Sequence, residues 1–421
     1  MLQGVYGLTM MSSNFLSVKD DRRGHMRTSR LATLVAAGAI VLPLLACNAS
    51  VVAASPRAST PIGKQLAELK GSDTVAGDSL GNAVAISGST VIVGAYDHAK
   101  SAGRAYVFAT TGSGWKQMSE LQGSDTVSGD QFGSSVSVSG TTAVVGAGGH
   151  ADHAGRAYVF AKTPGGWKQT AELKGSDTVA GDNFGWSVAI SGETIVVGAY
   201  GHAKNAGRAY VFTETPKGWT QTAELKSAGI LPGDQFGSSV AISGPTIVVG
   251  ATNRSAAAGR AYVFAKTGSA WKQVAKLQGL DTIAGDHFGW SVGISGTTAV
   301  VGAFLHAKSA GRAYVFTKAS GWKQTAELKG SDTAPVDGFG ISVAIASIGI
   351  VVGATGHASG AGRVYMFTKT PGGWKQVAEL KGLDTAPSDE FGFSLGLWET
   401  SLVVGAPEHD GHAGRGYVLK V

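Results

Sequence analysis

Pairs of one aspartate and one histidine, 25 residues apart, recur along the sequence and are the residues best suited to chemistry. An imidazole can act as an acid, a base or a metal ligand near neutral pH, and a carboxylate can orient it. One repeat carries Gly229 and Arg254 in these two places, so both members are lost together. The pairs are Asp73 and His98, Asp125 and His150, Asp177 and His202, Asp281 and His306, Asp332 and His357, and Asp384 and His409.

We interpret these pairs as structural clamps between loops. Their joint loss in one repeat indicates that the two side chains touch, with the carboxylate accepting an imidazole N–H. Catalysis usually needs one asymmetric group of residues, whereas this sequence offers six nearly equal copies. A metal site and an acid–base pair are the functional alternatives.

A second set of charges is present in every repeat. It joins an aspartate before a Phe-Gly pair to an arginine that opens a strand-like run, and we expect a repeated polar network in which the carboxylate bonds turn N–H groups or the guanidinium. A ring of arginines that faces a channel and binds an anion is the alternative. The aspartates are residues 78, 130, 182, 234, 286, 337 and 389, and the arginines are residues 104, 156, 208, 260, 312, 363 and 415.

A repeat of about 52 residues must position these side chains. Its Phe-Gly pair occurs six times, and in the first copy, Leu80-Gly81, leucine replaces the phenylalanine. Each unit holds four runs rich in β-branched and aromatic residues, which in the third copy are 187–191, 194–199, 208–212 and 219–225. Four strands in each of seven units predict an all-β fold, a seven-bladed β-propeller of four-stranded antiparallel blades. A linear β-solenoid is the structural alternative.

The two ends of the repeat region predict a closed ring. The last copy stops at residue 421, after its third strand-like run, and the missing fourth run resembles residues 63–69, GKQLAEL. We expect this N-terminal strand to pair beside residues 415–419 and complete the last blade. An open ring would leave apolar blade faces in water, at about 25 cal/mol per Å². The propeller domain is therefore assigned to residues 63–421.

Residues 1–47 predict an export signal. A basic segment with Arg27 and Arg30 precedes the apolar residues 31–45 and a small-residue cleavage site, and Met26 is a candidate for the true start. The apolar run is too short for a convincing membrane span.

Leu44 to Cys47 resembles a bacterial lipobox, so we expect lipidation of Cys47, the only cysteine. Ordinary secretion with cleavage after Ala54 is the alternative. Residues 48–62, rich in Ala, Ser and Pro, predict a flexible tether. We therefore expect a membrane-anchored lipoprotein on the extracytoplasmic side, or a secreted protein.

The composition argues against a disulfide-stabilised protein and against a nucleic-acid-binding protein. A single cysteine allows no intramolecular disulfide. The net charge of +6 includes the basic leader, and no lysine or arginine cluster marks a nucleic-acid surface.

Three motifs carry a family resemblance. Gly-Asp-Asn-Phe-Gly at 181–185, Val-Val-Gly-Ala at 196–199 and Gly-Arg-Ala-Tyr-Val-Phe at 207–212 resemble FG-GAP repeats, the units of integrin alpha-chain propellers and of many bacterial surface proteins. The resemblance covers residues 64–421 and implies a fold rather than an activity. Integrin propellers carry calcium loops of the type Asp-x-Asp-x-Asp-Gly. This sequence contains none, so calcium does not follow from the resemblance.

Differences between repeats indicate where specificity lies. Connections from fourth to first strands and from second to third strands share one rim, because neighbouring strands are antiparallel, and loops commonly carry binding residues. Trp186 and Trp290 follow Phe-Gly in two repeats only; we favour core packing for them, with narrowing of the channel or its mouth as the alternative. The fourth and fifth repeats depart most from the rest. The predicted binding patch contains Asn253, Arg254, Phe304, Leu305, Trp186 and Trp290.

These features predict a non-enzymatic cell-surface or secreted propeller that binds a protein or another surface macromolecule through its loop-rich rim. We expect no cofactor, no nucleic acid, and contact with a membrane only through a lipid anchor. A lectin-like propeller that binds carbohydrate is the alternative. An enzyme with a site in the central channel is a third interpretation, and His287, unique at its place in the repeat, is its candidate residue.

Overall fold

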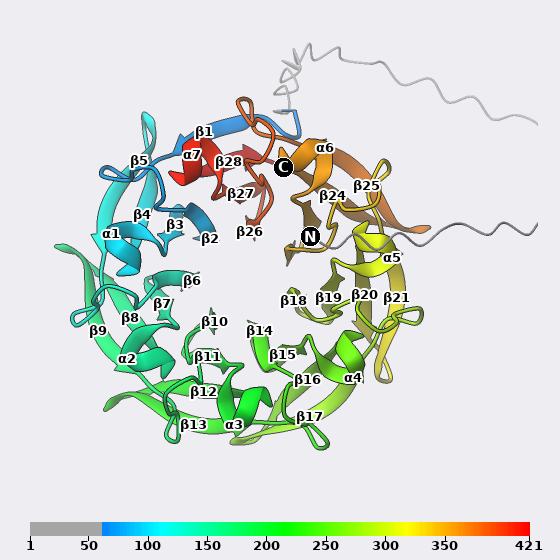
Figure 1. Cartoon of the computed structure of the whole chain (residues 1–421), viewed down its shortest axis with the longest axis horizontal. Coiled ribbons are helices and arrows are strands. Elements are labelled where there is room, and N and C mark those ends of the chain that lie inside the picture. Colours follow the sequence, from blue (N-terminus) through cyan, green and yellow to red (C-terminus); the bar gives the residue numbers. More distant parts are fainter. Residues whose placement is uncertain (1–60) are drawn as a thin grey trace, which may run out of the picture. The chain divides into compact units, whose positions relative to one another are not determined.

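A ring of seven four-stranded antiparallel sheets surrounds a central channel in the computed structural model, which describes residues 61–421 (Figure 1). In six of the sheets the strands follow chain order from the channel outward, and in the seventh the first strand of the chain is outermost. The predicted seven-bladed propeller is therefore confirmed. The export signal of residues 1–47, the alternative start at Met26, Cys47 and nearly all of the tether lie outside the described residues.

Blades 1 to 6 each take four consecutive strands. Blade 1 has β2 (Leu80–Ser87), β3 (Thr90–Ala95), β4 (Arg104–Thr111) and β5 (Gly114–Leu121); blade 2 has β6 (Phe132–Ser139), β7 (Thr142–Ala147), β8 (Arg156–Thr163) and β9 (Gly166–Leu173). Blade 3 has β10 (Ser187–Ser191), β11 (Thr194–Ala199), β12 (Arg208–Thr215) and β13 (Gly218–Leu225); blade 4 has β14 (Phe236–Ser243), β15 (Thr246–Ala251), β16 (Arg260–Thr267) and β17 (Ala270–Leu277). Blade 5 has β18 (Val292–Ser295), β19 (Thr298–Ala303), β20 (Arg312–Lys318) and β21 (Trp322–Leu328); blade 6 has β22 (Val343–Ala346), β23 (Gly349–Ala354), β24 (Arg363–Thr370) and β25 (Gly373–Leu380).

Blade 7 joins the two ends of the repeat region. It contains β26 (Ser394–Trp398), β27 (Ser401–Ala406), β28 (Arg415–Lys420) and, as its outermost strand, β1 (Gln65–Leu69). In the antiparallel ladder Glu68 lies opposite Tyr417, and Arg415 Nε donates to Glu68 Oε1 at 2.6 Å. The predicted closure of the ring by the N-terminal strand is confirmed.

A four-residue turn connects the second and third strands of every blade. These turns are α1 (His98–Ser101), α2 (His150–His153), α3 (His202–Asn205), α4 (Arg254–Ala257), α5 (His306–Ser309), α6 (His357–Gly360) and α7 (His409–His412). Non-glycine residues inside them adopt positive φ, for example Ala203 at 52° and Lys204 at 62°. We call the rim that carries these turns and the fourth-to-first connections the loop rim.

The Phe-Gly pair fixes each blade to its neighbour. Phe132 is fully buried, with its ring centroid 5.5 Å from that of Tyr158. Gly133 has φ +93°, and a Cβ there would lie 2.2 Å from the carbonyl oxygen of Arg104 in the preceding blade. Phe132 also forms a parallel bridge with Gly103, and Leu80 with Gly414 repeats that bridge where the ring closes. Neighbouring loops of the loop rim are therefore joined by backbone hydrogen bonds.

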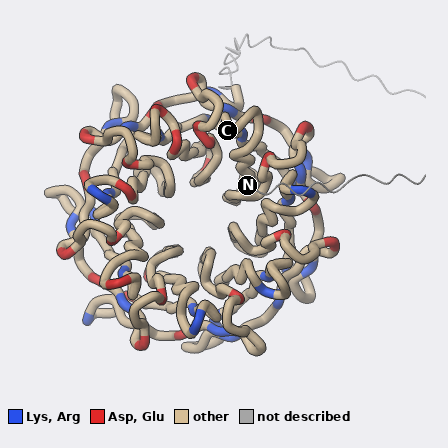
Figure 2. The backbone as a smooth tube through the Cα atoms, viewed as in Figure 1, with Lys and Arg blue, Asp and Glu red and all other residues tan. Residues whose placement is uncertain are grey.

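Charged side chains lie away from the channel. Figure 2 shows the innermost strands in tan, with every Lys, Arg, Asp and Glu position farther from the channel, and the sequences of these strands contain no charged residue. Among residues 61–421, no helix has both the length and the apolar character needed to cross a membrane. The channel is thus lined by neutral side chains.

Candidate functional site

The predicted aspartate–histidine pairs lie together on the loop rim, but their hydrogen bonds differ from those expected. In blade 1, His98 Nδ1 lies 2.9 Å from Oδ2 of Asp78, while its Nε2 is 3.6 Å from Asp73, a separation longer than a hydrogen bond. Asp73 instead accepts the Tyr106 hydroxyl at 2.7 Å. The expected imidazole N–H bond to Asp73 is therefore wrong. The direct partner is Asp78, the aspartate before Phe-Gly, whose side chain is more buried than that of Asp73.

The same geometry is present in the five other blades that carry both residues. The histidine Nδ1 lies 2.8–2.9 Å from the aspartate before Phe-Gly, and Nε2 lies 3.5–3.8 Å from the aspartate of the predicted pair. The predicted pairs are Asp125 and His150, Asp177 and His202, Asp281 and His306, Asp332 and His357, and Asp384 and His409.

Each tyrosine in this network is held neutral. Burial and the hydrogen bond to Asp177 raise the pKa of Tyr210 far above its ordinary value, and the same causes act on its five counterparts. The neutral hydroxyl therefore stays a donor to the aspartate throughout the ordinary pH range. These tyrosines were not among the predicted site residues, because they stand in a strand-like aromatic run.

Six of the seven repeated arginines pair outward with a glutamate rather than with the aspartate before Phe-Gly. Arg208 Nε donates to Glu224 Oε1 at 2.6 Å, from the third strand to the fourth, while Asp182 accepts the backbone N–H of Val179. The alternative of an arginine ring that faces the channel is therefore wrong. The hydrogen bond from a turn N–H to this aspartate was expected, but the pairing of the arginine with a glutamate was not.

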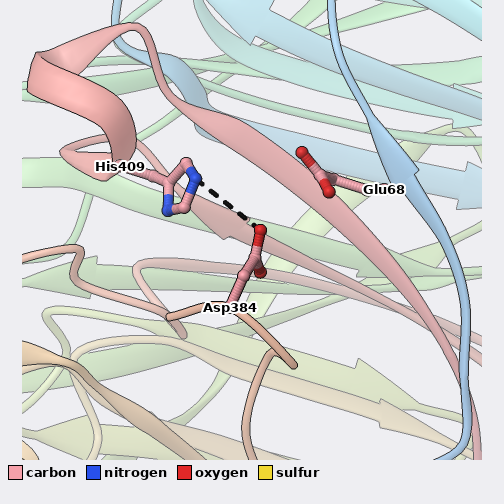
Figure 3. A group of neighbouring side chains, drawn as sticks. All are labelled: Glu68, Asp384 and His409. Atoms are coloured by element: carbon pink, nitrogen blue, oxygen red, sulfur yellow. Dashed lines mark ion pairs between the residues drawn. The ribbon is translucent and has the colours of Figure 1, made fainter. Parts of the chain in front are cut away.

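Two of these networks gather three potential metal ligands. In blade 7 the side chains of Glu68, Asp384 and His409 point toward one another (Figure 3). Each group already has an intramolecular partner, since Glu68 accepts from Arg415, Asp384 accepts from Tyr417, and His409 Nδ1 lies 2.8 Å from Asp389. These bonds use His409 Nδ1, Asp384 Oδ1 and Glu68 Oε1, so a metal ion held by the remaining ligand atoms would keep them but would lie beside the Arg415 guanidinium. The arrangement is that of a structural network.

The channel mouth on the loop rim offers a different kind of site. It is ringed by the residue that follows each Phe-Gly or Leu-Gly pair, and two cavities of about 330 and 360 Å³ open between these side chains. Cavities of this size suit a small ligand or one part of a larger one. The ringing residues are Asn82, Ser134, Trp186, Ser238, Trp290, Ile341 and Phe393.

Aromatic pairs form the walls of the mouth. Trp186 stacks edge-on against Tyr200 with centroids 4.9 Å apart, and Trp290 packs against Phe304 at 4.7 Å. Each tryptophan is 42% exposed. The favoured prediction of core packing for Trp186 and Trp290 is therefore wrong, because both side chains precede the innermost strands and line the mouth rather than the space between blades.

Unused hydrogen-bonding groups lie among these aromatic rings. Asn82 Oδ1, Ser238 Oγ and His287 Nδ1 are buried and have no hydrogen-bond partner among residues 61–421. Burial lowers the pKa of His287, so its imidazole is neutral at neutral pH. Tyr96 lies at the same mouth, and burial together with Asp97 raises its pKa to about 12. The mouth therefore combines aromatic surfaces with neutral donors and acceptors.

The predicted binding patch divides into two places. Trp186, Trp290 and Phe304 belong to the channel mouth, whereas Arg254 lies in the outer network of blade 4 and donates to Asp234 at 2.7 Å. Asn253 and Leu305 occupy equivalent positions before α4 and α5 and are partly buried. Sequence analysis missed Phe393, Asn82 and Ser238. The available signal was that the position after Phe-Gly varies between otherwise similar repeats.

The repeat geometry agrees with a comparison to known families. The FG-GAP repeat profile matches seven consecutive segments, 64–108, 115–160, 167–212, 219–264, 271–316, 322–367 and 374–419. The chain belongs to the FG-GAP repeat family. Each matched segment contains the outermost strand of one blade and the first three strands of the next, and FG-GAP propellers of this kind fit a binding or adhesion role. None of the curated proteins compared with this FG-GAP chain matches it.

Proposed function

We propose that this FG-GAP propeller is a non-catalytic binding module of an exported protein, which recognises a surface macromolecule through the channel mouth. The observation that carries the proposal is the exposure of Trp186 and Trp290 beside polar groups that have no hydrogen-bond partner within the described residues, in an otherwise well-packed ring. Exposed aromatic rings in a concave site supply binding energy, and convergent neutral polar groups supply orientation.

This proposal includes the inference that the protein does not catalyse a reaction. The aspartate–histidine networks repeat in six blades and bond to their own tyrosines and backbone, which favours a structural role over an acid–base role. His287 is the strongest catalytic candidate, but it stacks against Trp290 and Phe304, with centroids 6.4 and 6.1 Å away, as a wall residue does.

A carbohydrate ligand is the second candidate, as expected of a lectin-like propeller. Asn82, Gln131 and Gln235 bring amide groups to a mouth walled by tryptophan and tyrosine, and no charged side chain from residues 61–421 lines either of its two cavities. Amides, hydroxyls and aromatic faces match the hydroxyl groups and apolar ring faces of a neutral sugar. A glycan array that stays silent with the purified protein would count against this candidate.

Site-directed crosslinking tests where the ligand binds. A photoreactive group is attached at Ser134→Cys on the mouth, or at Glu193→Cys in the β10–β11 turn on the opposite rim, each in a Cys47→Ser background. We expect crosslinks to a cell-surface macromolecule from the mouth position alone. Equal crosslinking from both positions would contradict a ligand site at the mouth.

Export and lipid attachment are proposed from the leader. Mass spectrometry of the mature protein is expected to show a diacylated N-terminal Cys47, and Cys47→Ser is expected to release the protein in soluble form. A mature N-terminus at Ser55 would instead indicate ordinary secretion.

A further inference from the structure

Blade 4 lacks two carboxylates that the other six blades place in their outer network. Gly229 stands where the others have an aspartate, and Lys276 stands where they have a glutamate. Arg254 replaces the histidine. Apart from the histidine, the network of blade 3 contains three carboxylates and one guanidinium, whereas that of blade 4 contains one carboxylate and three cations. The local charge is therefore inverted from net negative to net positive.

The inversion leaves hydrogen-bond donors without their usual acceptors. In the other blades the arginine Nε donates to the fourth-strand glutamate at 2.6–3.0 Å, but Arg260 Nε is buried and has no partner within residues 61–421. The hydroxyl of Tyr262 likewise has no carboxylate acceptor in the described part of the chain, although its six counterparts each have one.

The place of the missing aspartate is open. A Cβ built on Gly229 would meet only Arg254 Nη2, at 3.9 Å. Arg254 itself bonds through Nη1 to Asp234, the one carboxylate that blade 4 retains. Lys276 is exposed on the outermost strand, so an external group can approach it.

We propose that blade 4 binds the carboxylates of an acidic protein segment, at a site formed by Arg254, Arg260, Tyr262 and Lys276. The groups missing from this network are an aspartate and a glutamate, so side chains of the same chemistry from a partner restore the bonds made in the six other blades. Guanidinium groups bind carboxylates through charge-assisted hydrogen bonds.

The surroundings favour a protein over an acidic polysaccharide. Leu231 is 58% exposed in the connection that enters blade 4, and Leu280 is 87% exposed four residues after Lys276. Apolar side chains beside a cationic site suit a peptide, which brings both carboxylates and apolar groups. The outer edge of β17 also leaves backbone groups for an extended segment. The site is separate from the channel mouth, so it does not depend on the function proposed for that mouth.

Fluorescence anisotropy with a fluorescein-labelled hexaglutamate peptide tests the proposal on the whole protein. Lys276→Glu restores the glutamate of the other blades, and we expect it to weaken binding by at least about ten-fold. Lys272→Glu, on the same exposed face of β17, changes the net charge equally without touching Arg260, and we expect a change below about two-fold. Thermal unfolding checks that both variants fold.

Several outcomes would overturn the proposal. They are no binding of hexaglutamate at low salt, equal weakening by Lys272→Glu and Lys276→Glu, equal binding of a hexaglutamine peptide, or binding of polygalacturonate without binding of the peptide. The first three reject a specific carboxylate site. The last one rejects a protein partner in favour of a uronic-acid polymer.

Discussion

His202 Nδ1 lies 2.9 Å from Oδ2 of Asp182, and that same carboxylate oxygen accepts the backbone N–H of Val179. One buried carboxylate thus joins the α3 turn to the connection that enters blade 3. In blade 4 the pair becomes Arg254 and Asp234 at 2.7 Å, so a guanidinium can take the place of the imidazole.

This relationship predicts unequal effects of two substitutions at His202. His202→Ala leaves Asp182 without its side-chain donor, and we expect the free energy of unfolding to fall by about 1–2 kcal/mol. His202→Arg reproduces the arrangement of blade 4, and we expect a loss below about 0.5 kcal/mol. Urea denaturation measures both values. Equal losses for the two variants would show that the clamp is not an interaction with Asp182.

Six buried tyrosines predict a steep loss of stability in alkali. Burial and the neighbouring aspartates raise the pKa of Tyr210 and its counterparts well above the unfolded value of about 10. The folded state therefore binds these protons more tightly; their contribution is complete below pH 10 and is lost as the pH rises through the folded-state pKa. Ultraviolet absorbance and circular dichroism are expected to show tyrosinate appearing together with unfolding. Ionisation of all ten tyrosines near pH 10 in a folded ring would contradict this.

Closure of the ring by β1 predicts that deleting this strand destabilises the protein and that a peptide with its sequence restores the stability. Leu69 is 1% exposed and packs in the core between blades 7 and 1, so deletion of residues 1–70 opens that core to water. We expect the truncated chain to unfold at lower temperature, and a synthetic peptide of residues 61–70 to restore the midpoint. A peptide with Leu69→Asp serves as the control. An unchanged midpoint after truncation would contradict closure by β1.

Left-handed residues in the turns predict a stabilising glycine. Lys204 is exposed with φ 62°, a conformation that costs a non-glycine residue about 1–2 kcal/mol. Lys204→Gly is therefore expected to raise the free energy of unfolding by about 1 kcal/mol. Lys168→Gly in the strand β9 is the control, and it is expected to lower the value by about 0.5–1 kcal/mol. Destabilisation by Lys204→Gly would contradict the strain in α3.

The fold could be predicted because its determinants repeat. Gly133 is needed at one close approach to the preceding blade, and the same requirement recurs about every 52 residues, which reveals both the period and the number of blades. The resemblance between residues 63–69 and the other fourth strands was enough to predict closure.

Partners within the loops could not be predicted from spacing. Asp177 and Asp182 belong to the same connection, and which of them meets His202 depends on positive φ values at Gly181 and Asn183. The loss of one aspartate together with one histidine in blade 4 reflected membership of one network rather than a direct hydrogen bond. The exposure of Trp186 could not be predicted, because its place directly before an innermost strand does not show whether the side chain packs between blades or lines the channel mouth.

Binding by tryptophan variants tests the central proposal, the ligand site at the channel mouth, most directly. Trp398 is as exposed as Trp186 and Trp290, at 42%, but stands at the β26–β27 turn on the opposite rim. Retention of the fluorescently labelled protein on intact cells of its own source is measured for Trp186→Ala/Trp290→Ala and for Trp398→Ala. We predict at least about a ten-fold loss for the double variant and no change for Trp398→Ala. Undiminished retention of the double variant, or equal loss for Trp398→Ala, would contradict the proposed site.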